Sequence, residues 1–289
     1  MLPLLDAVVP LSKGLTCQRK QVGSVPIKIY SPEGTSLEVL PCLFYIHGGG
    51  FGYGEAPYHI QLVQQYAEKV RCRVVTVDYR LLPAYRYPAE PEDVKAVYRW
   101  ILSHAEELKI DRNKVAVGGD SAGGCLTATL VNSCKSAEMP CFQMLIYPVT
   151  DALQQTESVR NYQDTPLWNA KNNAKMWNRY LKGTSVEEQK AASPMQNRLP
   201  KGLPSTYVEV AEYDCLHDEG LACAERLRAA GVQVAVNDTK GTYHGYDICL
   251  YSKLVKEQVA KRIKALQDGF AAVQSAPQDR SAFEKTAVL

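Results

Sequence analysis

VAVGGDSAGG, residues Val115 to Gly124, is the stretch that decides the fold of this 289-residue chain. A β-branched run leads into G-x-S-x-G at Gly119–Gly123, and an apolar stretch with helical spacing follows. A sharp strand-to-helix turn of this kind lifts the serine oxygen above the edge of a sheet, and its neighbours must be small because the backbone approaches itself closely. The stretch therefore predicts Ser121 as a nucleophile, with a simple tight turn as the alternative.

Outward from this turn, short apolar runs alternate with longer amphipathic stretches. The expected strands are 25–30, 43–47, 73–78, 115–118, 142–147, 206–210 and 233–237. The expected helices are 58–70, 92–108, 122–134, 219–230 and 248–270. This alternation is typical of βαβ units, so we predict an α/β fold with a mostly parallel central sheet flanked by helices.

One interval, 151–203, breaks the alternation because it contains no clear strand. Trp168 and Trp177 lie in it, within a helical pattern over residues 167–181. An ordinary connection between two core strands is much shorter. We therefore expect this segment to form a small helical cap.

A second glycine-rich motif, HGGGF at His47–Phe51, follows the expected strand 43–47. Three consecutive glycines cost conformational entropy, and they are explained if backbone N–H groups must face a ligand without obstruction. Lipases and esterases use this pattern to supply oxyanion donors. The alternatives are a flexible turn and a phosphate loop, but the Gly-Lys-Ser/Thr that a P-loop requires does not follow. His47 itself is expected to brace the loop.

A serine nucleophile needs a histidine base and a carboxylate that orients it, and after an elbow of this type the carboxylate precedes the histidine in the chain. Only His217 and His244 lie downstream of Ser121. His244 follows the last expected strand and is flanked by Gly241 and Gly245, so a loop can return it over the sheet edge. It is therefore the preferred base. The upstream histidines, His59 among them, are interpreted as structural or surface residues.

Four carboxylates near the strand 206–210 are candidates for the acid: Glu212, Asp214, Asp218 and Glu219. Asp218 and Glu219 open a helix, where acidic residues stabilise the N-terminus without any catalytic role. Asp214 lies just past the strand end, on the sheet edge expected for the serine and the histidine. It is preferred over Asp218.

Taken in order, these motifs resemble the hormone-sensitive-lipase family of α/β-hydrolases, the HGGG esterases. Residues 79–89, YRLLPAYRYPA, are similar to the family's Y-R-L-A-P-x-x-x-F-P-A segment. Residues 214–220, DCLHDEG, are similar to its D-x-L-x-D, and His244-Gly245 matches its histidine motif. Gly52, Leu82 and Ala84 depart from the family's usual residues, outside the expected triad.

The resemblance implies a single α/β-hydrolase domain over residues 1–289, with a cap built from about 1–22 and 151–203. It implies a serine carboxylesterase that hydrolyses short-chain esters of the acetyl to butyryl type through an acyl-enzyme. The chain has 17 tyrosines, and Tyr53, Tyr58, Tyr213 or Tyr243 at the pocket would suit an acetylated carbohydrate.

The same resemblance implies the site residues. The triad would be Ser121, Asp214 and His244, and the oxyanion hole would use the backbone N–H groups of Gly49, Gly50 and Ala122. No metal and no other cofactor is expected.

Two other functions stay open. One is amide or formamide hydrolysis, because formamidases of the same fold reuse an HGG loop and this triad. The other is a ligand-binding receptor, because gibberellin receptors resemble the family but lack the catalytic histidine. His244 favours an enzyme over a receptor.

Composition excludes several further classes. The 33 Lys and Arg against 31 Asp and Glu give a net charge of +2, so nothing favours a nucleic-acid partner. Nine cysteines without a C-x-x-C pair favour free thiols in a reducing cytoplasm over a disulfide scaffold or a zinc site. The N-terminal MLPLLDAVVP lacks the basic region of a secretion signal, and no apolar run reaches the ~18 residues of a membrane span. The expected partner is a small-molecule ester, with a homodimer as a further hypothesis.

Overall fold

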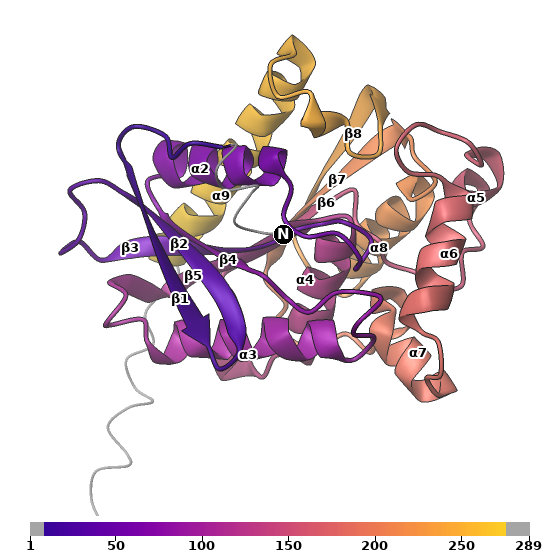
Figure 1. Cartoon of the computed structure of the whole chain (residues 1–289), viewed down its shortest axis with the longest axis horizontal. Helices are drawn as coiled ribbons and strands as arrows, with labels where there is room; N and C mark the ends of the chain where they lie inside the picture. The colour runs from indigo at the N-terminus through magenta and orange to yellow at the C-terminus, as the bar shows by residue number, and fades with distance from the viewer. Residues whose placement is uncertain (1–8, 276–289) are drawn as a thin grey trace, which may run out of the picture.

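The computed structural model describes residues 9–275, which form one eight-stranded sheet (Figure 1). The strand order is β1-β2-β4-β3-β5-β6-β7-β8. The strands are β1 (Leu15–Val22), β2 (Val25–Pro32), β3 (Leu40–Ile46), β4 (Arg73–Val77), β5 (Ile110–Asp120), β6 (Phe142–Ile146), β7 (Ser205–Tyr213) and β8 (Val234–Tyr243). From β4 to β8 every neighbouring pair is parallel, whereas β1 and β2 pair antiparallel. The predicted α/β-hydrolase fold is confirmed.

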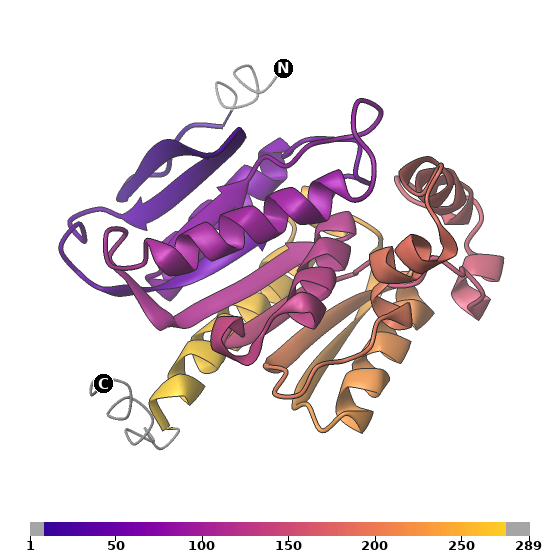
Figure 2. The ribbon, with the colours of Figure 1, turned by 90° about the horizontal axis from the view of Figure 1, so that it is seen from below.

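Helices cover both faces of the sheet, as the turned view in Figure 2 shows. On one face lie α2 (Pro57–Val70) and α9 (Lys253–Ser275), and on the other lie α3 (Ala89–Ser103), α4 (Ala122–Ser133) and α8 (His217–Ala229). Two short 3-10 turns, η1 (Ser136–Glu138) and η3 (Tyr246–Ile248), follow α4 and β8. Each helix follows a parallel strand or precedes one, because parallel strands require a crossover connection.

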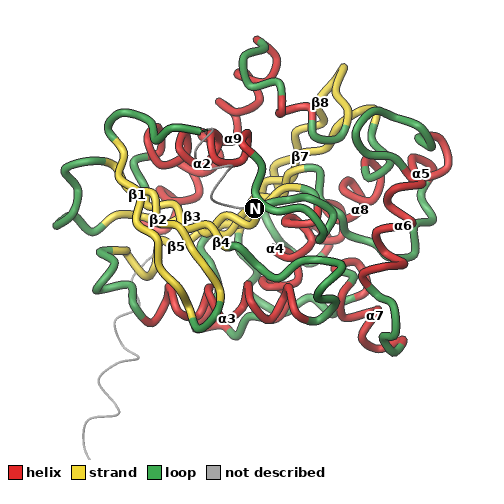
Figure 3. The backbone as a smooth tube through the Cα atoms, in the orientation of Figure 1, coloured by secondary structure: helices red, strands yellow, loops and turns green. Residues whose placement is uncertain are grey.

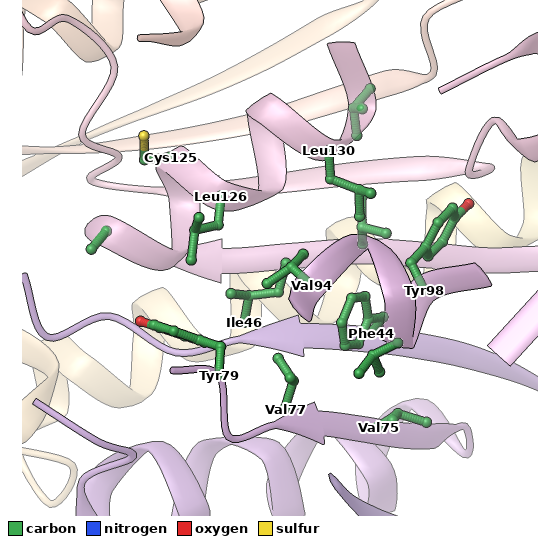
Figure 4. Packing of buried hydrophobic residues seen from close by; sticks show 14 of the residues in the cluster. Phe44, Ile46, Val75, Val77, Tyr79, Val94, Tyr98, Cys125, Leu126 and Leu130 are labelled. Carbon is green, nitrogen blue, oxygen red and sulfur yellow. The ribbon is translucent and has the colours of Figure 1, made fainter. Parts of the chain in front are cut away.

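Apolar side chains from the sheet and the helices form the core. Figure 4 shows Phe44 and Ile46 of β3 packed beneath Val94 and Tyr98 of α3. A second cluster fills the space between the opposite face of the sheet and the pair α2 and α9. The strands of the middle of the sheet are buried on both faces, which explains why they read as continuous apolar runs.

The prediction that the N-terminal segment belongs to the cap is wrong for residues 15–22. Residues 1–8 lie outside the described part of the chain, but Leu15–Val22, which the sequence interpretation placed in the cap, form β1 at the edge of the sheet. Only Leu15 of this strand is buried, and Cys17, Lys20 and Val22 are partly buried. An edge strand with so few apolar side chains has a weak sequence signal, and pairing along all eight residues of β2 defines it instead.

The interval 151–203 consists of helices and loops without a strand, as the colours of Figure 3 show. It contains α5 (Glu157–Asn161), α6 (Ala170–Tyr180), α7 (Val186–Ala192) and the 3-10 turn η2 (Pro194–Gln196). The predicted helical pattern at 167–181 corresponds to α6. This segment stands at one end of the sheet, beside α8 (Figure 1).

Two carboxylates at the start of α8 hold this segment. Glu219 is buried, and its Oε1 accepts hydrogen bonds from the N–H groups of Thr150 at 2.6 Å and Asp151 at 3.3 Å. Asp218 accepts a hydrogen bond from the N–H of Ser158 at 2.7 Å. The two residues expected to stabilise the helix N-terminus therefore also fix the start of the segment 151–203 against α8.

Burial raises the pKa of Glu219 to about 8, whereas an unfolded glutamate titrates near about 4.3. A carboxyl with a raised folded pKa stabilises the protein below its unfolded pKa, and this contribution is lost as the pH rises through the folded value. We expect the free energy of unfolding to fall by about 2 kcal/mol between pH 6 and 8 through this group. Glu219→Gln should remove that slope in urea titrations. An unchanged slope in the variant would show that Glu219 is ionised throughout.

Candidate active site

Ser121 lies at the turn between β5 and α4 in a strained backbone conformation, with φ of 54° and ψ of −120°. Its N–H donates a hydrogen bond to the carbonyl of Ile146 at 2.9 Å. A Cβ on Gly119 would lie 2.5 Å from the carbonyl oxygen of Ile46, and one on Gly123 would lie 2.0 Å from the same atom. The glycines of the motif are therefore required by close packing of the turn against the end of β3.

His244 and Asp214 meet Ser121 at the same edge of the sheet. The Nε2 atom of His244 lies 2.8 Å from the Oγ of Ser121, and its Nδ1 lies 2.7 Å from Oδ2 of Asp214. Asp214 is fully buried at the end of β7, and its second oxygen accepts a hydrogen bond from the N–H of Leu216. The imidazole thus has one nitrogen on the hydroxyl and the other on a fixed carboxylate, which is the arrangement of a serine nucleophile, a base and an orienting acid.

The alternative base and acid lie elsewhere. The ring of His217 contacts Asp218 at 2.9 Å and Asp238 at 3.4 Å. Asp218 is bonded to Ser158, as described above, and Glu212 accepts a hydrogen bond from the N–H of Gly241. None of these groups is hydrogen-bonded to His244 in the part of the chain that the structure describes.

The loop that follows β3 brings its glycines to Ser121. Gly49 has φ of 116° and Gly50 has φ of 58°. Residues other than glycine rarely adopt such positive φ angles. A Cβ on Gly49 would lie 2.5 Å from the carbonyl oxygen of Tyr53, and one on Gly50 would lie 2.9 Å from the ring of Trp168. Ala122 is the first residue of α4, where an N–H has no acceptor within its own helix. Gly49, Gly50 and Ser121 line one cavity.

Asp120 connects the serine turn to the glycine loop, a role that the sequence motifs did not predict. Its buried carboxylate accepts hydrogen bonds from the N–H of Gly48 at 3.1 Å and from the hydroxyl of Tyr45 at 2.8 Å. Its other oxygen lies 3.0 Å from Nε2 of His59 on α2. His59 is therefore a buried partner of the site and not a surface residue.

Asp120 and His59 each stabilise the charged form of the other. Burial alone would raise the pKa of Asp120, but the charge of His59 and hydrogen bonds from His59 and Tyr45 outweigh it and hold the pKa at about 2. Burial alone would lower the pKa of His59, yet the facing carboxylate raises it. By contrast, burial lowers the pKa of His47 to about 4. Its neutral ring stacks on Tyr79, with 4.4 Å between the ring centroids.

A buried ionic network lies next to His244 and supports it. Arg262 of α9 is fully buried between Glu209 of β7 and Asp247 of η3, and its contact with Asp247 is 2.7 Å. Asp247 also accepts a hydrogen bond from the hydroxyl of Tyr147 at 2.6 Å. The ring of Tyr147 packs edge-on against His244 at 4.7 Å. Breaking such a network is costly because it leaves a buried charge without a partner, so the loop around His244 is firmly held.

The cavity lined by Ser121 and His244 has a volume of about 960 Å³. Near Gly50 its wall is apolar, formed by Trp168 and Met176. Of the four tyrosines considered from the sequence, Tyr53 and Tyr58 line it, and Tyr213 and Tyr243 do not. Residues 9–275 contain no group of three or more His, Cys, Asp or Glu arranged to hold a metal ion, and no helix in the same range has the length and apolar character to cross a bilayer.

Replacing Asp120 by Asn tests whether this carboxylate positions the loop. The variant loses the charge that holds His59 and weakens the acceptor for Gly48, so we expect kcat for p-nitrophenyl acetate to fall by about tenfold or more. Complete loss of one oxyanion donor costs about 10²–10³, and a displaced donor costs less. His104→Gln is the control, because this histidine caps the C-terminal end of α3 and does not line the cavity. A wild-type kcat for Asp120→Asn with an intact circular dichroism spectrum would contradict this role.

Comparison with known proteins agrees with this geometry. Residues 43–248 match the family described as alpha/beta hydrolase fold. Esterase LipI of Mycobacterium tuberculosis is 35% identical over 230 residues, which are 78% of this chain and 71% of that protein. The ethyl acetate hydrolase of Pseudomonas putida is 32% identical, over 77% of this chain and 71% of its own.

Solved structures give the same result. The bacterial heroin esterase superposes with a TM-score of 0.85 at 33% identity, covering 93% of this chain and 89% of that one. Esterase LipW from Mycobacterium marinum superposes with a TM-score of 0.82 at 30% identity, covering 93% and 85%. The chain therefore belongs to the α/β-hydrolase family, among the carboxylic ester hydrolases that are similar to hormone-sensitive lipase.

Proposed function

We propose that this esterase hydrolyses small esters by two-step acyl transfer, with Ser121 as nucleophile, His244 as base and Asp214 as orienting acid. The observation that carries the proposal is the continuous hydrogen-bonded chain from the Ser121 hydroxyl through the His244 ring to the buried Asp214 carboxylate. His244 takes the serine proton as Oγ attacks the ester carbonyl, and then gives it to the departing alcohol. Water, activated by the same ring, releases the acid.

The negative charge on the carbonyl oxygen needs donors beside Ser121. We assign this role to the N–H groups of Gly49, Gly50 and Ala122. The positive φ angles of the two glycines support the assignment, because they turn backbone groups toward the cavity without a Cβ in the way. Ala122 adds the partial positive charge of the N-terminus of α4.

The proposed substrates carry short acyl groups of the acetyl to butyryl type. The apolar wall next to Gly50 is formed by the large side chains of Trp168 and Met176, which limit the depth available beside the oxyanion donors. The ethyl acetate hydrolase among the relatives carries a name that denotes an acetyl ester. Tyr53 and Tyr58 at the cavity keep acetylated carbohydrates among the candidates.

The segment 151–203 is proposed to act as the cap over this cavity. Tyr180 of α6 stacks on Phe51 of the glycine loop, with 3.8 Å between ring centroids and 7° between ring planes. Trp168 lies against Gly50. These two contacts join the segment 151–203 to the glycine loop after β3. The packing that covers the cavity therefore also holds the glycines in position.

The nine cysteines are all free thiols, and this supports the expectation of a reducing, cytoplasmic compartment. Burial raises the pKa of Cys72 to about 12 and that of Cys223 to about 12. Such thiols behave as small apolar groups. Cys125 and Cys215, next to the catalytic turns, are buried in the same way.

Ser121→Ala tests the nucleophile. We expect turnover of p-nitrophenyl acetate to fall by roughly 10⁴-fold or more, because removing the nucleophile of a triad leaves only the catalysis by binding and by the oxyanion hole. Ser133→Ala, an exposed serine near the end of the same helix, is the matched control. Turnover in Ser121→Ala comparable to that of the control would contradict the proposal.

The acyl-chain preference and the preference for esters over amides are both measured on the wild-type enzyme. We expect kcat/KM for p-nitrophenyl esters to be highest between acetyl and butyryl and to fall for longer chains, because Trp168 and Met176 limit the depth of the cavity beside Gly50. An N-formyl aromatic amine should be a poorer substrate than the acetyl ester. Preference for acyl chains beyond about ten carbons, or for the amide, would contradict the assignment.

A further inference from the structure

The outer part of the catalytic cavity is lined by four positively charged side chains. Lys175 and Arg179 come from α6, Lys182 follows that helix, and Arg86 comes from the loop between β4 and α3. All four are exposed. The mouth of the cavity is therefore basic, although the whole chain carries a net charge of only +2.

The spacing of residues on α6 explains this arrangement. Asn172, Lys175, Met176 and Arg179 all line the cavity, and they stand at positions i, i+3, i+4 and i+7, which lie on one face of a helix. Met176 is buried on this face, whereas the two cations reach the surface. One helix thus contributes Met176 to the apolar inner wall and two of the four cations to the rim.

These cations lack partners of opposite charge. No ion pair or side-chain hydrogen bond of Arg86, Lys175, Arg179 or Lys182 occurs within the described residues. Asp120 is the only carboxylate among the described residues that line the cavity, and it is bound to His59. Nearby, Glu92 contacts Arg80, and Glu188 accepts the hydrogen bond of the Ser185 N–H.

We propose that the preferred substrates are esters that carry an anionic group, a carboxylate or a phosphate, at a distance from the reacting carbonyl. This inference rests on the proposed function of the Ser121 site. The apolar wall near Gly50 receives the uncharged part of the substrate, and the cations at the rim hold the anion. A cleft lined by charges of one sign raises the local concentration of the opposite charge and the rate of association, and an arginine binds carboxylate or phosphate with a planar pair of donors.

Two substrate pairs test the preference. In the first pair the acyl group carries the charge, as in p-nitrophenyl hydrogen glutarate against its neutral near-isostere p-nitrophenyl 5-methylhexanoate. In the second pair the alcohol carries it, as in 4-acetoxybenzoate against 4-acetoxybenzamide. After correction for the uncatalysed rates, we expect kcat/KM to favour the anion by about tenfold at low salt in at least one pair. The preference should shrink toward one at about 0.5 M NaCl, because exposed charges are screened.

Paired charge variants locate the effect. We expect the double variant Lys175→Gln/Arg179→Gln to lower the ratio of anionic to neutral kcat/KM by about fivefold. The matched double variant Lys171→Gln/Lys190→Gln removes the same charge from exposed residues of the same segment that do not line this cavity, and it should leave the ratio unchanged.

The outcomes separate the two proposals. A ratio of anionic to neutral kcat/KM of one or less in both substrate pairs would contradict the anionic preference. An equal decrease of this ratio in both double variants would contradict it as well. Neither result would contradict the proposed esterase activity. Failure of the wild-type enzyme to hydrolyse any of the four esters would instead contradict the proposed function.

Discussion

The strained backbone of Ser121 is the constraint on which the site depends. Its φ of 54° is sustained because the first turn of α4 packs directly on the end of β3, with Gly119 and Gly123 too close to the Ile46 carbonyl for any side chain. Backbone strain of this kind costs about 1–3 kcal/mol and persists only where the surrounding structure determines it. The same close packing brings the glycine loop after β3 beside the serine, so one contact places both the nucleophile and the proposed oxyanion donors.

Two buried ionic groups complete this constraint. The Asp120 carboxylate joins the serine turn to Gly48 and to His59 of α2. Arg262 joins α9 to β7 and to the turn after His244. Asp120 lines the cavity, whereas Arg262 does not, and both act by holding the backbone in position. Ser121, His244 and Asp214 are thus held from the strands that carry them, while Trp168 and Met176 of the segment 151–203 line the cavity.

Much of this arrangement was predictable from the sequence, because it depends on local signals. The glycine pattern around Ser121 and the apolar runs of the parallel strands mark the elbow and the sheet. Since parallel strands end at one edge, the positions of Asp214 and His244 after their strands were enough to predict that they meet. Helix α6 was predictable from the helical spacing at 167–181, and the length of the interval 151–203 indicated more than an ordinary connection between core strands.

The rest depends on contacts between distant segments, which carry no local pattern. β1 is a mostly polar edge strand, defined by pairing with β2. His59 lies 61 residues from Asp120, and nothing in its neighbourhood indicates a buried partner. Arg262 lies in a basic stretch that resembles a solvated helix face, yet it is the largest fully buried side chain of the described residues. The cations of α6 also look like an ordinary exposed face until the fold places them at the cavity.

Covalent labelling by diethyl p-nitrophenyl phosphate is the most direct test of the central claim, that the fold makes one serine nucleophilic. The Ser121 oxygen forms the bond to phosphorus, p-nitrophenolate leaves, and His244 receives the serine proton. The account predicts one diethylphosphoryl group per chain, mapped by mass spectrometry to the peptide containing Ser121, with activity lost in proportion to labelling. Complete loss of activity with Ser121 unmodified, or equal labelling of several serines, would contradict it.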